Sequence, residues 1–240
     1  SGVVLSNVER KVRSRIFLLS SLGLSFVLSL VFVLDIWYEF LIFTNRTSFG
    51  ISDPVFGRDI EYFIFSLPFL NKLYNFLMLF IFVMATMTIL FNLYNFFTTR
   101  VNNEHFDINV RPIKNPKDIY INILGAASKQ LMFLGGILFL LIAFGFYLRT
   151  FDLLYSPRGV AFGASYINVK IGLPSYYIYI GICVLTAAVL ILSRNKKNIK
   201  LAVFGPLLLV VAMVASGVIS GVVQKIIVAP NEIVKEEKYL

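Results

Sequence analysis

Two carboxylates stand one helical turn apart near the end of a long apolar run. Asp35 and Glu39 are four positions apart, with Trp37 and Tyr38 between them. Ionisable groups within a membrane are candidates for a proton relay or for ligands of a cation. A helix that begins at Ile16 has already risen about 28 Å at Asp35, so both carboxylates are expected at the level of the headgroups. We therefore favour an interfacial belt of acidic and aromatic residues over a relay.

More charged residues gather in the segment ISDPVFGRDIEYFIFSLPF, residues 51–69. On a helical wheel its large apolar side chains fall in one arc, and the opposite arc holds Arg58, Asp59, Glu61, Tyr62 and Ser66. This pattern predicts a short amphipathic helix that lies in the outer membrane interface. Asp53 is its expected N-cap and Pro54 its first residue, while Pro68 is expected to disturb its end.

Arg149, Asp152 and Arg158 form a third charged group, at and after the end of a later apolar run. Anchoring at the membrane surface is the favoured interpretation of these charges. The alternative is that they join the earlier groups in one polar cluster on the outer face. That cluster would consist of Asp35, Glu39, Asp53, Arg58, Asp59, Glu61, Arg149, Asp152 and Arg158.

The sequence offers little for catalysis or for binding a cofactor. It has one histidine, His105, and one cysteine, Cys183, so a metal site built from clustered His and Cys is nearly excluded. The sequence motifs of P-loop, dinucleotide-binding, zincin and α/β-hydrolase proteins are absent. We expect no catalytic residue, cofactor or metal ligand, and we favour a protein that is not an enzyme.

Composition places the chain among integral membrane proteins. Of its 240 residues 58% are hydrophobic and 15% are charged, and its mean hydropathy is +0.81. The net charge of +9 could indicate a nucleic-acid binder, but the basic residues cluster beside apolar runs, as membrane topology requires. Nucleic acid is therefore not an expected partner.

Five apolar runs are long enough to cross a hydrocarbon core of about 30 Å. They lie near residues 16–43, 73–97, 130–148, 171–193 and 201–224. Because lipid offers the backbone no hydrogen-bond partners, such runs form helices. The predicted fold class is all-α, a polytopic membrane protein with additional interfacial amphipathic helices. Residues 1–15 would be a basic cytoplasmic segment, 16–224 the membrane domain and 225–240 the start of an extracytoplasmic region.

Basic residues alternate between the segments that connect these runs. Clusters at Arg10–Arg15, Arg100–Lys117 and Arg194–Lys200 precede the first, third and fifth runs, whereas the other connections are poorer in Lys and Arg. Basic loops stay on the cytoplasmic side. The pattern predicts a multi-pass protein of the plasma membrane, with its N-terminus in the cytoplasm and its C-terminus outside.

Small residues at intervals of four predict contacts between helices. In the fifth run these are Ala212, Ser216, Gly217, Ser220 and Gly221. The third run carries Gly135, Gly136 and Ala143. Helix packing is favoured over a ligand pocket at all of these positions.

A helix start is also visible before the third run. Asn115 is a suitable N-cap, and Pro116 follows at the first helical position. We expect an interfacial elbow here that leads into the third run.

Three strings in the connecting segments resemble the motifs of a known family. They are FGISDPVFGRDIEYFIFSLPF, DLLYSPRGVAFGASYINV and VAPNEIVKEEKYL, and together they make the chain similar to uncharacterised protein family 182 from Phe17 onward. The resemblance implies further membrane helices ahead of this region and a large extracytoplasmic domain after the PNE motif. The chain would then be an internal piece with five of about seven spans. The family implies no activity, so no catalytic residue is transferred.

These observations favour a membrane-embedded platform for an extracytoplasmic domain. A transporter or channel subunit is the alternative, although it would need polar residues deep in the bundle. An interfacial enzyme that acts on lipid or envelope precursors is the third hypothesis. The expected partners are the lipid bilayer, the remaining helices and the external domain of the same protein, and a second copy of the chain in a homo-oligomer.

Overall fold

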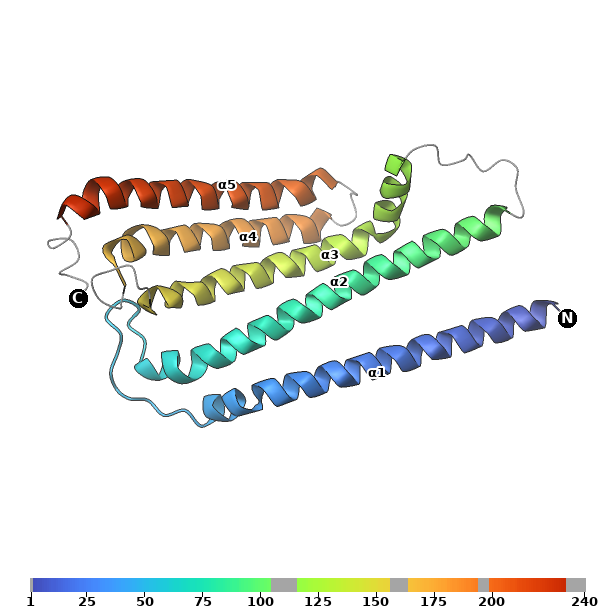
Figure 1. Ribbon diagram of the computed structural model, residues 1–240, viewed down its shortest axis with the longest axis horizontal. Coiled ribbons are helices and arrows are strands. Elements are labelled where there is room, and N and C mark those ends of the chain that lie inside the picture. The colour runs from blue at the N-terminus through green and yellow to red at the C-terminus, as the bar shows by residue number, and fades with distance from the viewer. Residues whose placement is uncertain (1, 105–115, 156–163, 194–198, 232–240) are drawn as a thin grey trace. The chain divides into compact units, whose positions relative to one another are not determined.

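Five long helices make up most of the chain (Figure 1). The computed structural model describes residues 2–104, 116–155, 164–193 and 199–231. The helices are α1 (Gly2–Thr44), α2 (Leu67–Glu104), α3 (Pro116–Asp152), α4 (Leu173–Ser193) and α5 (Ile199–Val223). Within these ranges β pairing is limited to one isolated bridge, between Ser52 and Asp59. The predicted all-α class is confirmed.

The five predicted runs lie in five helices of the described chain that are long and apolar enough to cross a membrane. These stretches are 18–44, 62–94, 130–152, 168–193 and 203–231. The largest differences from the prediction are the second, which begins at residue 62 rather than near 73, and the fifth, which continues past 224. Both differences have a local cause, a π-helical turn that joins the end of the helix.

Three π-helical turns share one sequence feature, a proline that follows two positions later. The turns are η1 (Tyr62–Ser66), η3 (Asn168–Gly172) and η4 (Gln224–Val228), and Pro68, Pro174 and Pro230 follow them. In each turn an N–H donates to the carbonyl five residues back, as Leu67 N–H does to Tyr62 O. A proline inside an α-helix removes one N–H and crowds the carbonyl four residues earlier. The wider π turn relieves this crowding, so the helix continues.

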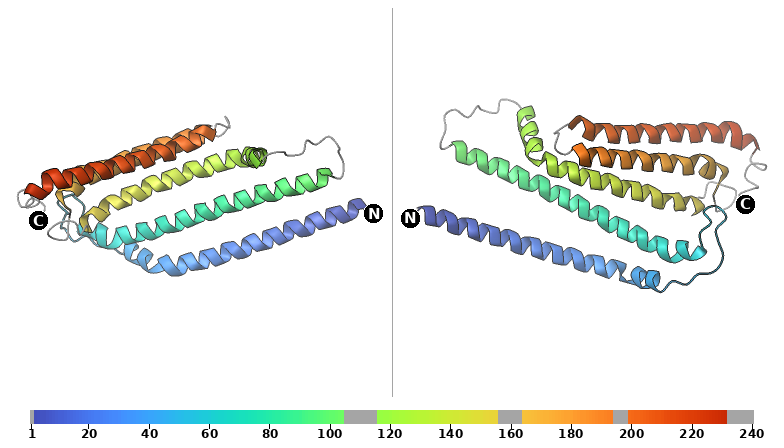
Figure 2. Two further views of the ribbon diagram at one scale, coloured as in Figure 1. Left: turned by 45° about the horizontal axis from the view of Figure 1, so that its top comes forward. Right: turned by 180° about the vertical axis from the view of Figure 1, so that it is seen from behind.

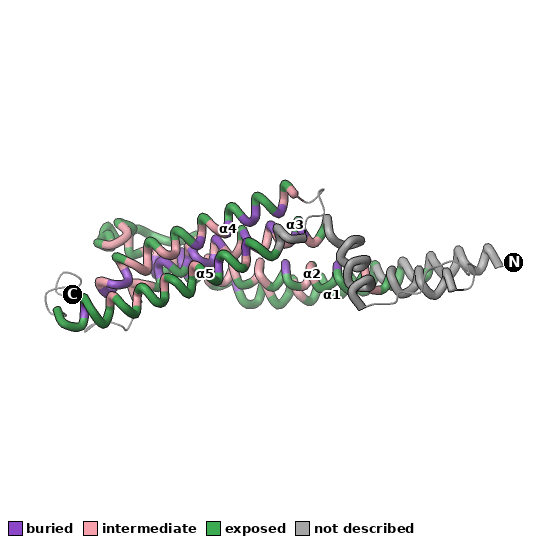
Figure 3. Tube along the Cα trace, turned by 90° about the horizontal axis from the view of Figure 1, so that it is seen from above, coloured by how far each residue is buried: buried purple, intermediate pink, exposed green. Residues whose placement is uncertain are grey.

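The chain divides into two compact units, Ser1–Leu73 and Tyr74–Leu240, which we describe separately. The first unit contains α1, the connection after it and the start of α2. α1 is mainly exposed along its described side chains, as the colours of Figure 3 show. Its C-terminal end packs on the start of α2, where the Phe69 ring lies 4.6 Å from that of Phe43 and 5.9 Å from that of Phe40.

The connection between α1 and α2 differs from the predicted amphipathic helix. Residues 54–56 form a turn, and helical structure begins only at Ile60. Asp53 is therefore not the N-cap of a helix, Pro54 is not a helical residue, and Pro68 does not end the helix. From Ile60 onward the chain runs through η1 into α2 without a break, so the polar residues from Glu61 to Ser66 belong to the first turns of a long helix.

In the second unit α3, α4 and α5 lie side by side in both views of Figure 2. The core between them is formed by Phe139, Ala143, Phe146, Tyr179, Cys183, Ala187, Leu190 and Leu209. A Cβ added to Gly136 would lie 3.2 Å from Ala187 O and within contact of Ile191, so α3 and α4 approach closely there. The predicted contacts at Gly136 and Ala143 are confirmed.

The second part of α2 also contacts α3. Gln130 Nε2 donates to Thr88 Oγ1 at 3.2 Å, and the Tyr74 ring packs so closely that a Cβ on Gly145 would lie 2.5 Å from its hydroxyl oxygen. Polar links of this kind hold membrane helices together where lipid supplies no competing partner.

The start of α3 agrees with the predicted helix start. The helix begins at Pro116, and Figure 1 shows its first turns bent away from the axis of the rest of α3. Asn115, the predicted cap, lies outside the described residues.

The contact between α4 and α5 depends on the absence of a side chain at Gly205. A Cβ there would lie 2.9 Å from Thr186 Cβ and 2.6 Å from Thr186 Oγ1. Thr186 is β-branched and buried, and its hydroxyl donates to Ile182 O at 2.7 Å, so it has little freedom to move away.

Gly205→Ala is therefore expected to destabilise the bundle by about 1–3 kcal/mol, the usual cost of overpacking. Gly181→Ala is the matched control, because a Cβ at Gly181 meets nothing within 4 Å. The measurement is the midpoint of thermal unfolding in detergent, which should fall for Gly205→Ala and stay or rise for Gly181→Ala. Equal midpoints for the two variants would show that this contact does not hold α5.

Candidate functional site

Asp53 organises a turn in the connection between α1 and α2. Its Oδ2 accepts hydrogen bonds from Val55 N–H at 2.9 Å and Phe56 N–H at 2.6 Å. Its backbone closes the turn, since Asp53 N–H donates to Arg58 O and Gly57 N–H to Asp53 O, each at 2.8 Å. Gly57 has φ +63°, a backbone conformation that residues with a side chain rarely adopt. The Asp53 carboxylate thus accepts backbone N–H groups as an N-cap does, but it stabilises a turn and not the start of a helix.

Asp59 is the centre of the hydrogen bonding in this connection. Its carboxylate accepts from Ser48 Oγ, from Gly50 N–H at 3.0 Å and from Phe49 N–H at 3.3 Å. It also accepts from Glu61 N–H at 3.0 Å, which makes Asp59 the N-cap of the helix that begins at Ile60. These donors, the Ser48 hydroxyl first, lower the pKa of Asp59 to about 2 against the smaller opposing effect of desolvation.

Arg46 joins the end of α1 to the start of the next helix. Its Nε lies 3.1 Å from Glu61 Oε1, and its Nη1 donates to Ser66 Oγ at 3.0 Å. The guanidinium also lies over the Phe43 ring, 4.5 Å from the centroid. Ser66 is 2% exposed, so this link reaches the buried side of the helix.

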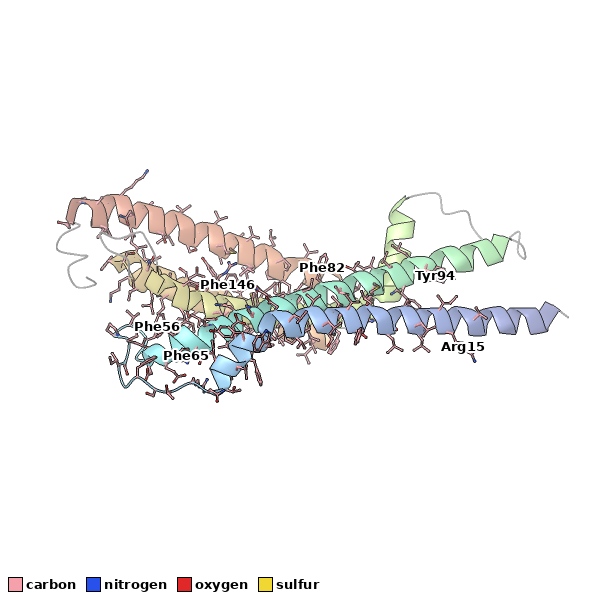
Figure 4. The ribbon with its side chains drawn as sticks, turned by 60° about the horizontal axis from the view of Figure 1, so that its bottom comes forward. Arg15, Phe56, Phe65, Phe82, Tyr94 and Phe146 are labelled. Carbon is pink, nitrogen blue, oxygen red and sulfur yellow. The ribbon has the colours of Figure 1, made fainter. Side chains whose placement is uncertain are left out.

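The outer surface of this connection carries the remaining side chains of the segment. The Arg58 guanidinium lies 4.3 Å from the centroid of the Tyr62 ring. Phe49 is half exposed, with its ring 5.8 Å from that of Phe65, and Ile51 is 60% exposed. Figure 4 shows Phe56 and Phe65 at this end of the first unit and Arg15 far along α1. We call residues 45–61 the capped loop.

Lys72 binds both carboxylates of the predicted Asp35–Glu39 pair. Its Nζ lies 2.8 Å from Glu39 Oε1 and 3.2 Å from Asp35 Oδ1, and it donates to the Asp35 carbonyl oxygen at 2.6 Å. A cation and two anions at one depth avoid an isolated charge in an apolar segment. The pair therefore joins α1 to α2.

Six of the nine predicted cluster residues lie in the first unit, where they form two groups. Asp53, Arg58, Asp59 and Glu61 belong to the capped loop, and Asp35 and Glu39 meet at Lys72. Arg149 and Asp152 lie at the end of α3 in the second unit, and Arg158 lies outside the described residues. The alternative interpretation, one outer-face cluster of all nine residues, stays a prediction.

A cavity of about 680 Å³ lies in the second unit, bounded by the ends of α3 and α5 and by η3, α4 and η4. Four of the five predicted packing residues of α5 line it. A Cβ at Gly217 or Gly221 would meet nothing within 4 Å, and Ser216 Oγ is hydrogen-bonded to the Tyr179 hydroxyl. Ser220 also lines the cavity, whereas Ala212 packs against the core.

Sequence reasoning missed Arg46, Ser48 and Lys72 as partners in these groups, and Asn168 as a residue that lines the cavity. Lys72 had a usable signal, because it is the only charged residue between 62 and 94 and therefore needs an anion at its own depth. Ser48 and Asn168 had no such signal in the sequence. The role of Ser48 depends on the conformation of a loop, and that of Asn168 depends on a π turn. Among the described residues, no group of three or more His, Cys, Asp and Glu is placed to hold a metal ion.

The fold and these polar groups first indicate the class of protein to which the chain belongs. Long apolar helices, joined at their ends by ordered polar connections, are the features of a polytopic helical membrane protein. The chain belongs to the uncharacterised protein family UPF0182, whose family description matches residues 4–240. The resemblance seen in the connecting strings is thereby confirmed.

Curated relatives carry the same family name. A UPF0182 protein of Alkaliphilus metalliredigens is 34% identical over 86% of this chain and 22% of its own length. A UPF0182 protein of Clostridium novyi is 34% identical over 88% of this chain and 23% of its length, and one of Clostridium acetobutylicum is 29% identical over 99% and 26%. The chain thus spans about a quarter of these relatives. No solved structure matches it significantly.

The Asp59 network should make the capped loop sensitive to acid. Because the pKa of Asp59 is about 2 in the folded loop against an ordinary 3.8, its ionised form stabilises the loop above pH 3.8. This stabilisation is lost as the pH falls from 3.8 towards 2. The protection of the Phe49, Gly50 and Glu61 amides from hydrogen exchange, relative to their intrinsic rates at each pH, should therefore fall in that window.

Two variants separate the Asp59 network from general acid unfolding. Asp59→Asn should accelerate exchange of these amides at neutral pH and remove the acid-dependent change. Ser48→Ala removes the largest cause of the lowered pKa, so its transition should be smaller and should end at a higher pH than that of the wild type. If the amides of Asp59→Asn and of the wild type responded to acid alike, Asp59 would not be the responsible group.

Proposed function

We propose that this chain is the membrane part of a longer plasma-membrane protein and that its capped loop holds the extracytoplasmic part of the same protein. The chain spans about a quarter of its curated relatives, so most of each relative lies outside the matched region. The partners implied are the bilayer, further helices and the external domain.

The observation that carries this proposal is an ordered loop with an exposed apolar surface. Asp53 and Asp59 together accept six hydrogen bonds within residues 48–61, which fix the backbone of the loop. On this fixed backbone Phe49 is 50% exposed and Ile51 60% exposed. Ordered loops on a rigid scaffold are where binding surfaces are most often found, which supports this loop as the place where the external region docks.

The alternation of the spans supports this role for the loop. With five crossings, the capped loop, the connection between α3 and α4 and the end of α5 would share one side of the membrane. The positive-inside rule makes that side the outside, with the N-terminus in the cytoplasm. The external region after α5 would then start on the side where the capped loop lies.

Transport is the second candidate function, and the cavity is the observation that favours it. The polar groups of Asn168, Ser216, Ser220 and Gln224 line a space among three apolar helices. A platform needs no such space. Uptake of a labelled solute by proteoliposomes that contain the full-length protein, absent for empty liposomes, would favour transport over the platform.

The platform is tested by cutting the full-length protein after the fifth span. With an engineered protease site there, we expect the released external region to stay on washed membranes, because it docks on the capped loop. Phe49→Ala with Ile51→Ala should release it into the supernatant. Phe26→Ala with Val27→Ala is the matched control, since these α1 side chains are 64% and 55% exposed but lie away from the loop.

Two results would contradict the proposal. Release of the wild-type external region by the cut alone would show that no docking surface exists. Retention by the Phe49 and Ile51 variant, equal to that of the control, would show that docking does not use the capped loop.

A further inference from the structure

The cavity of the second unit has the size of a ligand site. Its volume of about 680 Å³ falls within the usual range of about 300–1,000 Å³ for small-molecule pockets. It extends along one side of α5 and η4 from Met213 to Gln224, a rise of roughly 16 Å at 1.5 Å per residue. The space is therefore elongated along the helices.

Asn168 lines this cavity and carries a donor that the protein leaves unused. The residue is 4% exposed, and its side-chain Nδ2 has no hydrogen-bond partner. Its place is fixed, because its backbone N–H donates to Ser165 Oγ at 3.3 Å and its carbonyl accepts from Leu173 N–H across η3. A buried donor without an acceptor is unfavourable. A hydrogen-bond acceptor bound inside the cavity would therefore stabilise this side chain.

Arg149 makes the cavity electropositive. Of the described residues that line it, Arg149 is the only charged one, and Ser175 and Ser220 add hydroxyl donors. Asp152, one turn further on in α3, interacts electrostatically with Arg149 but does not line the cavity, so the lining itself contains no carboxylate. A permanent cation with neutral donors and without a carboxylate suits a singly charged anion, and guanidinium fits phosphate oxygens well.

The remaining wall suits an apolar body attached to that anion. Phe146, Tyr176 and Met213 line the cavity with aromatic and thioether groups. Gly217 and Gly221 leave the α5 side open, since a Cβ on either would meet nothing within 4 Å. A molecule with an anionic end near Arg149 and an apolar chain along α5 would satisfy both parts.

We propose that the cavity among α3, α4 and α5 binds the anionic phosphate ester of an amphiphile, which in this setting is an acidic membrane lipid. Arg149 and the Asn168 side-chain amide would donate to the phosphate oxygens, and the acyl chain would lie against Met213 and the two glycines. This inference concerns a site that the platform function does not use, so either can fail alone.

The experiment is lipid binding to the full-length protein, measured by native mass spectrometry from detergent. Phosphatidylglycerol, phosphatidylcholine and soluble glycerol 1-phosphate are titrated separately. We expect one phosphatidylglycerol to bind at least about tenfold more tightly than phosphatidylcholine, because one charge-assisted contact is worth about that factor. Equal binding of glycerol 1-phosphate would support the phosphate site and assign its ligand to the aqueous phase.

Three variants test the geometry. Arg149→Gln and Asn168→Asp should each weaken phosphatidylglycerol binding by at least about tenfold. Gly217→Leu should abolish it by filling the cavity, and it also decides the matter if a polar variant fails to fold, because its Cβ meets nothing. Lys170→Gln is the control: Lys170 is an exposed cation of the same π turn that does not line the cavity.

Equal affinity for phosphatidylglycerol and phosphatidylcholine would overturn the proposal. Unchanged binding by Gly217→Leu would do the same, since the ligand would then lie elsewhere. Absence of any bound lipid or glycerol 1-phosphate would also overturn the proposal.

Discussion

The structure depends on one constraint, that an apolar slab gives the backbone no hydrogen-bond partner except itself. Helices satisfy this constraint along their length, but a proline removes one donor and crowds one carbonyl. Pro68 and Pro174 each follow a π turn that relieves this crowding while the helix continues, and Pro230 follows a third π turn at the end of α5. The turns also have a consequence for function, because η3 carries Asn168 and η4 begins at Gln224, and both residues line the cavity.

The same constraint explains where the charges lie. Asp35 and Glu39 share Lys72, and Arg46 bridges Glu61 and Ser66, so charged groups near the apolar segments meet partners from a neighbouring helix. The acids of the capped loop accept backbone N–H groups instead, which replaces the hydrogen bonds that helix or sheet would supply. Hydrogen bonds from side chains thus stabilise the conformation of the connections, whereas hydrogen bonds within the backbone stabilise the spans.

The sequence predicts the spans well and the connections poorly, for a physical reason. Hydropathy over twenty residues is a strong signal, and the apolar stretches of the five helices match the predicted runs within a few residues at most of their ends. The wheel of residues 54–67 could not separate a turn at 54–56 from a helix, because the outcome depends on Ser48 reaching Asp59 from eleven positions away. The small residues of α5 predicted packing. Ala212 packs against the core and Ser216 is hydrogen-bonded to Tyr179 of α4, whereas Gly217, Ser220 and Gly221 line the cavity.

The central claim, that five helices cross a bilayer with the capped loop outside, is tested most directly by cysteine labelling. Replacing the buried Cys183 by Ala leaves a chain without cysteine, into which single cysteines are placed at Ser52, Lys197 or Asn231. The account predicts that a membrane-impermeant maleimide labels the Ser52 and Asn231 positions on intact cells and the Lys197 position only after permeabilisation. Labelling of the Lys197 position on intact cells, or of Ser52 and Asn231 from opposite sides, would contradict it.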